Sequence, residues 1–535
     1  MKKILAALLA VAMLASLAAC GGDSSQSSSS SSQSSSSAAD DSSDSNSEDS
    51  SAAGGRFDSL QTTDEQVSLL IDFHSFTPSV SETPTEESPT VFNSSRQILA
   101  SWLEDKPNVT VEWSRGKDMS SNATMLEWMN IQINAGNAPD ILFSWGSTYS
   151  TNGWFENLNE VVESPQYYEE GSPVWKDVFP DYLWKDSMHV DANGDVVAIP
   201  STVYPGPPTV YIYNAEIFDA VGITPAKDWD QFMADMKKVQ EAGYIAFDPN
   251  STSIIDGGSW DHQFSMRGHA LAVQDKWDLD GDGIQSSVEG TRALWSGVYY
   301  MQTLPGLFEE WQTQKDKYIN VVTKGGEAID YEQDWIDGKV AVKERGIWDF
   351  PTENSNTKRT FEFRMMPPPV KTSEYTGTIE WTEAGPYVPQ PMEAFNIMKP
   401  ELQDRPDYNF DYAVDFLKFT HNTENLSMMV EERAGACMGA TKTCSVPAIL
   451  SDWYKQSFPK NPNCNTMSSS TSDGAVKIGK LLENWFLDQI SDDEFKTQWD
   501  QIVYEDLLKY VEDNNIDTSE WGEIFVPDAA KIGRA

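Results

Sequence analysis

Strands and helices alternate along the first part of the chain, and this alternation constrains the fold more than any other feature. Apolar stretches typical of buried strands occur at Val67–Phe73, Asn108–Trp113 and Pro139–Ser144. Between them, Arg96–Glu104 and Met119–Ala135 have the apolar spacing of helices. Strands that alternate with helices predict an α/β fold in which a parallel sheet is covered on both faces.

The same pattern continues further along the chain. Two more strands are predicted at Asp195–Pro200 and Thr209–Asn214, and Asp228 with Gln231 has the spacing of a capping box at the start of a helix. The last third is helical, and Ser491 with Glu494 has the spacing of a capping box. About 475 residues follow the first 60, which is more than one hydrophobic core holds, so we expect two large lobes.

Several of these segments resemble, in order, the motifs of one family, the maltose-binding-protein-like (family 1) extracellular solute-binding proteins of ABC transporters. The matching stretches are Ala138–Phe143, Asn193–Pro200 with Tyr211–Phe218, Gly222–Trp229, Gly338–Val342 with Gly346–Trp348, and Ala413–Asn425. The resemblance covers most of the chain beyond its N-terminal region. It implies a type II periplasmic-binding-protein-like fold, in which two hinged α/β lobes close on a ligand.

The domain boundaries combine the composition of the N-terminal region with this resemblance. We expect a lipoprotein signal peptide at 1–20 and a disordered Ser-rich tether at 21–60. Lobe I is predicted to comprise 61–205 and 345–395, and lobe II 206–344 and 396–535. The calcium loop described below, 278–289, then belongs to lobe II.

The predicted ligand is an oligosaccharide, because the chain has 19 Trp and a flat apolar ring suits the face of a sugar. By the resemblance, the ligand-binding side chains are Trp145, Tyr149, Tyr204, Trp348, Trp381, Tyr387 and His74. A peptide or another small organic solute is the alternative ligand. A metal-ion importer is disfavoured, since only five His are present.

One segment, 278–289, has the spacing of a calcium-binding loop. Gly283 stands at the turn position, and the expected oxygen ligands are Asp278, Asp280, Asp282, the Ile284 carbonyl, Ser286 and Glu289. A calcium sensor would need a second copy, and the nearest candidate, 191–202, lacks the glycine and the final acid. We therefore expect a single structural calcium ion rather than a sensor or a catalytic metal.

The N-terminus predicts export. Two lysines precede an uncharged run, and the run ends at Leu17-Ala18-Ala19-Cys20, which resembles a lipobox. This predicts a palmitate-bearing lipid anchor at Cys20 and a location on the extracellular face of the cell membrane, with ABC transporter permease subunits as partners. A net charge of −45 argues against nucleic acid as a ligand, and we expect a monomer.

Three cysteines remain once Cys20 is lipid-modified. Outside the cytoplasm one disulfide is expected, and Cys437 with Cys444 would close the shortest loop and leave Cys464 as a thiol.

No catalytic motif is present: the chain has no GxSxG, HExxH or Walker sequence. We therefore predict a binding protein and not an enzyme. A secreted carbohydrate-active enzyme is the distant alternative, since paired carboxylates are easily found among 83 acidic residues.

Overall fold

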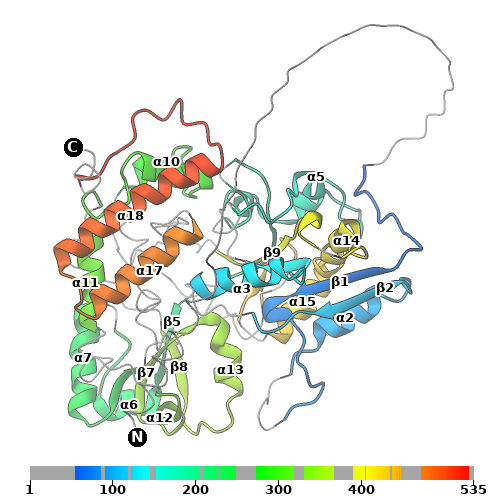
Figure 1. Cartoon of the computed structure of the whole chain (residues 1–535). Helices are drawn as coiled ribbons and strands as arrows, with labels where there is room; N and C mark the ends of the chain where they lie inside the picture. The colour runs from blue at the N-terminus through cyan, green and yellow to red at the C-terminus, as the bar shows by residue number, and fades with distance from the viewer. Residues whose placement is uncertain are drawn as a thin grey trace, which may run out of the picture. The chain divides into compact units, whose positions relative to one another are not determined.

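Two sheets, each with its own helices, make up residues 54–535 of this computed structural model (Figure 1). The residues that the structure describes are 55–85, 91–117, 122–144, 152–186, 188–191, 193–204, 209–226, 228–248, 273–304, 306–317, 331–366, 390–403, 405–433, 436–444, 446–447 and 471–528. Among them, no helix combines the length and the apolar character that a membrane span requires.

The lobe I sheet has six strands in the order β10-β4-β9-β3-β1-β2. The strands are β1 (Val67–Asp72), β2 (Val109–Trp113), β3 (Ile141–Phe143), β4 (Ile199–Val203), β9 (Pro391–Ile397) and β10 (Met438–Gly439). β1 is parallel to β2 and β3, as predicted, whereas β9 runs antiparallel to both β3 and β4. The sheet is therefore mixed rather than parallel. When the chain returns from lobe II, β9 begins beside the ends of β3 and β4 and so runs in the opposite direction.

Helices cover both faces of this sheet, as alternating residues of β3 show. Ile141 and Phe143 join the larger core, whereas Leu142 joins a separate cluster with Met125 and Met129 of α3 (Asn122–Asn134). The larger core is covered by α2 (Ser94–Trp102), α14 (Phe410–Thr420) and α15 (Thr423–Glu432), which pack against one another. The shorter helices of this lobe are η1 (His74–Phe76), α5 (Asn159–Val162), η2 (Trp175–Val178), η3 (Asp181–Trp184) and η7 (Pro400–Leu402).

The lobe II sheet has four strands in the order β6-β7-β5-β8. They are β5 (Thr209–Asn214), β6 (Ile245–Asp248), β7 (Val340–Gly346) and β8 (Phe363–Met366). Tyr211 and Tyr213 of β5 join one core and Val210 and Ile212 another, so this sheet also has two buried faces.

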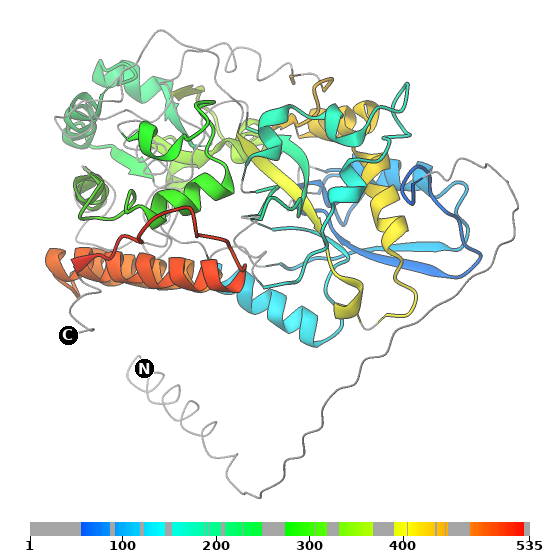
Figure 2. The same cartoon turned by 90° about the horizontal axis from the view of Figure 1, so that it is seen from above.

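The helices of lobe II pack mainly on the Tyr211 face. They are α6 (Ala215–Val221), α7 (Trp229–Glu241), α9 (Gln274–Trp277), α10 (Ser287–Trp295), α11 (Leu307–Lys317), α12 (Glu332–Ile336), η6 (Ile347–Asp349), α13 (Phe350–Ser355), α17 (Ser472–Phe486) and α18 (Asp492–Asp513). Two predicted N-caps are confirmed: the Asp228 carboxylate accepts from Gln231 N, and Ser491 forms a capping box with Glu494. The long helix α18 lies on one side of lobe II (Figure 2).

The predicted lobe boundaries are wrong at two places. The sequence-based division puts 345–366 in lobe I, but β7 pairs with β5 and β6, and β8 pairs with β5, so this segment stays in lobe II. It also puts 396–445 in lobe II, but α14, α15 and β10 pack in lobe I. The chain thus crosses between the lobes after β4, after β8 and again between β10 and α17.

Candidate functional site

The carboxyl ends of β1, β3 and β4 and the start of β9 lie together at one end of the lobe I sheet, which we call the lobe I edge. Because β9 is antiparallel to β3 and β4, its first residues lie beside the last residues of those strands, with Pro391 opposite Val203 and Phe395 opposite Phe143. Tyr204, directly after β4, donates its main-chain N–H to the Gln390 carbonyl at 2.8 Å. The chain leaves lobe I here after β4 and returns here at the start of β9, so two of the three crossovers meet at this edge. Ligands of open α/β sheets bind at such strand ends.

A buried ion pair lies at this edge. The Lys117 ammonium pairs with the Asp72 carboxylate at the end of β1, and the two side chains are only 5% and 7% exposed. The ammonium also donates to the Phe143 carbonyl at 2.8 Å. Burial lowers the pKa of Lys117, and the Asp72 carboxylate opposes that shift. The pair fixes the ends of β1 and β3 relative to each other.

His74 follows β1 in a backbone conformation that is rare for a residue with a side chain, with φ at 43°. Its main-chain N–H donates to Asp72 Oδ1 at 3.1 Å, and its ring stacks on Phe143 with centroids 4.4 Å apart. Burial, and then the positive charges of Lys117 and Arg433, lower the pKa of His74 well below its usual value. The imidazole is therefore neutral at physiological pH, and it offers a flat ring with one donor and one acceptor.

Glu393 on β9 completes the cluster. It is 2% exposed, and His74 Nε2 lies 3.6 Å from its Oε1 atom. Burial raises the pKa of Glu393 to about 7. A hydrogen bond from Ser75 opposes that shift, whereas the hydroxyls of Ser201 and Thr202 are buried and have no hydrogen-bond partner in the described part of the chain. Buried polar groups normally have partners, so this edge is our candidate for contact with a polar ligand.

The structure brings two of the predicted ligand-binding residues, His74 and Tyr204, to this edge. Tyr204 is half-buried and packs against the lobe I core. Trp348 lies in η6, after β7, and its side chain is outside the described residues, as are all of Trp145, Tyr149, Trp381, Tyr387 and Cys20.

Sequence reasoning missed Lys117 and Glu393. Lys117 lies in a loop with no motif. Glu393 lies in Pro391–Ile397, a strand in which every residue is buried. A single acidic residue inside such an apolar run was the available signal, since an acid is rarely buried without a special role.

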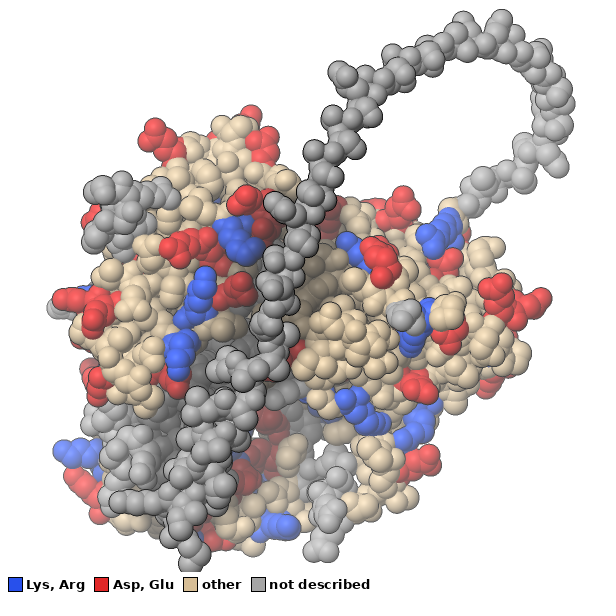
Figure 3. Space-filling view, viewed as in Figure 1, with Lys and Arg blue, Asp and Glu red and all other residues tan. Residues whose placement is uncertain are grey.

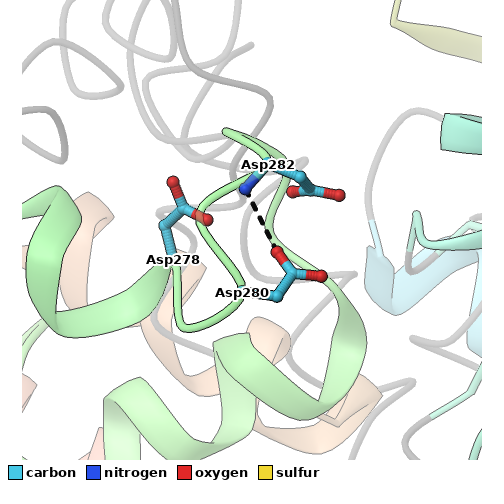
Figure 4. Close-up of side chains that lie close together, drawn as sticks. All are labelled: Asp278, Asp280 and Asp282. Atoms are coloured by element: carbon cyan, nitrogen blue, oxygen red, sulfur yellow. Dashed lines mark hydrogen bonds between the residues drawn. The ribbon is translucent and has the colours of Figure 1, made fainter.

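The predicted calcium loop connects α9 to α10 in lobe II. Atoms of the Asp278, Asp280 and Asp282 carboxylates lie within 4.8 Å of one another (Figure 4). Gly283 has φ at 80°, which suits a residue without a side chain at the turn. Ser286 caps α10 in a capping box with Glu289, so the end of the loop is fixed by the helix that follows.

The donor set fits a calcium ion. Asp278 Oδ1 is buried and has no hydrogen-bond partner among the described residues, and its carboxylate neighbours supply further oxygens. Glu289 is directed back across the loop, since its Oε1 accepts from Leu279 N at 2.7 Å. Carboxylate, hydroxyl and carbonyl oxygens are the ligands that calcium prefers. Of the six predicted ligands, Asp278, Asp280 and Asp282 bring their carboxylates together and would hold the ion, whereas the Ser286 hydroxyl and the Glu289 carboxylate bond each other at the end of the loop.

The predicted disulfide between Cys437 and Cys444 is not formed in the structure, where the two sulfurs are not bonded to each other. Cys437 is buried beside β10, whereas Cys444 Sγ lies 3.5 Å from the Ser427 hydroxyl on α15. Burial raises the pKa of both thiols, which disfavours the reactive thiolate. Cys464 lies outside the described residues.

Two α/β lobes joined by three crossovers, with buried polar groups at the edge where the chain crosses, define a hinged ligand-binding protein. Residues 97–457 match the family model of bacterial extracellular solute-binding proteins, which covers more than half of the chain. The chain belongs to this family, whose members are binding proteins and not enzymes.

An uncharacterized ABC transporter extracellular-binding protein from Pyrococcus horikoshii is 24% identical over 288 residues. This match covers 49% of the chain and 61% of the relative, so the chain spans less than two thirds of that protein.

Solved structures share the fold at low identity. A chitin oligosaccharide binding protein is similar with a TM-score of 0.56 and 14% identity, over 83% of this chain and 99% of that one. A protein from a study of xylan utilization by Caldanaerobius polysaccharolyticus has a TM-score of 0.54 and 16% identity, over 82% and 99%. RafE in complex with raffinose has a TM-score of 0.52 and 14% identity, over 83% and 99%.

Proposed function

We propose that this protein captures a carbohydrate between its lobes and delivers it to the permease of an ABC importer. Family membership supports the capture role. The observation that carries the ligand class is the lobe I edge, where the neutral His74 ring stacks on Phe143 beside the Glu393 carboxyl. Apolar ring faces next to hydrogen-bonding groups suit a sugar, which has both apolar faces and hydroxyls. The sugar-binding proteins that share the fold support the same class.

In this proposal the ligand acts through the hinge. A sugar that contacts both lobes binds the closed arrangement more tightly than the open one, and only this difference in affinity shifts the equilibrium. The closed form is then the one that docks on the permease. The polar groups at the edge orient the sugar: Glu393 accepts or donates according to its protonation state, and His74 supplies one donor and one acceptor.

We also propose that calcium in the 278–289 loop is structural. The loop joins α9 to α10 and gathers three aspartate carboxylates, of which Asp280 and Asp282 pair with Lys185. A bound divalent ion would neutralise them and hold the two helices in place.

The location that supports this role is the extracellular face of the membrane, with a lipid anchor at Cys20. The family is extracellular, and the lipobox-like sequence before Cys20 supplies the attachment. On the face shown in Figure 3, acidic side chains are scattered over both lobes rather than gathered in one patch, which favours solubility as the role of the negative charge.

Thermal unfolding of the protein with a panel of oligosaccharides tests the ligand class. A sugar at 100 times its Kd should stabilise the fold by about 2.7 kcal/mol and should be recovered intact. His74→Ala should weaken that sugar about tenfold, whereas Met428→Ala, an exposed change on α15, should leave the affinity unchanged.

If no sugar raises the midpoint and a peptide panel does, the carbohydrate proposal is wrong and the peptide alternative replaces it. Recovery of a cleaved glycan would instead support the carbohydrate-active enzyme.

A further inference from the structure

The calcium loop is attached to the opposite lobe. Lys185, directly after η3 in lobe I, places its ammonium 3.0 Å from Asp280 Oδ2 and also bonds Asp282 Oδ2. A second bond joins the same regions: the Ser287 hydroxyl donates to the Val190 carbonyl at 2.5 Å. The loop is therefore one of the places where lobe I and lobe II touch.

Both ends of this contact are fixed within their own lobes. Leu183, two residues before Lys185, is buried in the lobe I core. Trp277, directly before the loop, and Leu294 of α10 are buried in the lobe II core. Breaking the Lys185 contact therefore changes how the lobes touch, and not only the position of a surface side chain.

Lys185 occupies the oxygens that a cation would need. Asp280 Oδ1 accepts from Asp282 N at 3.2 Å, and Asp282 Oδ1 accepts from Ile284 N at 2.8 Å. Main-chain groups of the loop thus engage one oxygen of each carboxylate. The other oxygen of each carboxylate bonds the Lys185 ammonium. An ammonium and a divalent ion repel each other, so binding both to these carboxylates at once costs free energy.

We propose that Lys185 and a divalent cation compete for Asp280 and Asp282, so that filling the loop releases this interlobe contact. The inference rests on the proposed calcium site and extends it from a stabilising role to a regulatory one. Linkage makes the effect reciprocal: if the cation weakens the contact between the lobes, the contact weakens cation binding by the same factor. Calcium occupancy would then change the free-energy difference between the open and closed arrangements of the lobes, and with it the affinity for ligand.

Calorimetric titration with calcium tests the competition. Lys185→Met should bind calcium about two- to fivefold more tightly than the wild type, the range expected for loss of an exposed ion pair. Lys176→Met is the matched control, since Lys176 is equally exposed at 40% but pairs with Glu163 inside lobe I. Its calcium affinity should stay within about twofold of the wild type.

A second measurement follows the arrangement of the two lobes directly. Small-angle X-ray scattering of the wild type should change between chelator and saturating calcium, whereas Lys185→Met should give the same profile in both, because its interlobe ion pair is already absent. Equal calcium affinity in the wild type and in Lys185→Met overturns the competition and leaves the calcium site standing. Absence of calcium binding in both overturns the competition together with the calcium site, and leaves the carbohydrate proposal untouched.

Discussion

Two clusters of charge in this protein differ mainly in burial. At the lobe I edge, Lys117 and Asp72 are 5% and 7% exposed, and Glu393 is 2% exposed. At the calcium loop, Lys185 and Asp280 are 40% and 55% exposed. Buried charges interact strongly and are expensive to leave unpaired, whereas exposed pairs are weakened by water and salt. The first cluster is therefore suited to holding a rigid site. The second is suited to exchanging the Lys185 ammonium for another cation.

The largest expected effect comes from removing the buried ammonium. Lys117→Met should lower the free energy of unfolding by about 3 to 5 kcal/mol, because it leaves the Asp72 carboxylate buried without its cation. Urea denaturation measures the loss.

The exposed Lys176→Met provides the control, and it should change stability by less than about 0.5 kcal/mol. Similar small losses in both variants would show that the Lys117 pair is accessible to water, and the contrast between the two clusters would then fail.

The Glu393 carboxyl should make stability depend on pH. Its folded pKa of about 7 lies above the ordinary value of 4.5. Its contribution to the free energy of unfolding is therefore present below pH 4.5 and is lost as pH rises to about 7. Glu393→Gln removes this dependence, so the variant should gain on the order of 3 kcal/mol relative to the wild type between those pH values. Chemical denaturation at pH 4.5, 6 and 8 measures the difference, and a constant difference would contradict the burial argument.

Calcium removal should have an effect of similar size at the exposed cluster. At 100 times its Kd, calcium should stabilise the wild type by about 2.7 kcal/mol relative to chelator. Asp278→Ala should abolish that difference, because Asp278 is the first ligand of the loop and its Oδ1 is buried without a partner among the described residues. The quantity compared is the calcium-dependent shift, so any general loss of stability in the variant cancels. A shift that survives in Asp278→Ala would place calcium elsewhere.

Much of the fold could be predicted from local patterns. The strands at 67–72, 109–113 and 209–214 and the capped helices after Asp228 and Ser491 match the expectations, because apolar periodicity and caps are local properties. The lobe boundaries could not be predicted in the same way. Whether the chain crosses after β7 or after β8 depends on which strand pairs with β5, and that pairing is a long-range choice.

The candidate site shows the same division. The calcium loop could be found because its ligands lie within twelve consecutive residues. The lobe I edge could not, because Asp72, Lys117 and Glu393 are far apart in the sequence and meet only when β9 inserts between β3 and β4. The resemblance led to His74 and Tyr204 but not to the acid beside them, for which the available signal was its position inside an apolar strand. Lys185 was missed for the same reason, since its partners lie about a hundred residues away in the other lobe.

The smallest expected effect is that of Lys185→Met on stability without calcium. The ion pair with Asp280 and Asp282 is exposed, so in chelator and low salt the variant should lose less than about 1 kcal/mol. Raising the ionic strength to about 1 M, where the Debye length falls to about 3 Å, should reduce that loss further. Lys117→Met should keep its full loss in the same salt, because water and ions do not reach the buried pair. Denaturation of both variants at two salt concentrations makes the comparison, and an equal response to salt would show that burial is not what separates the two clusters.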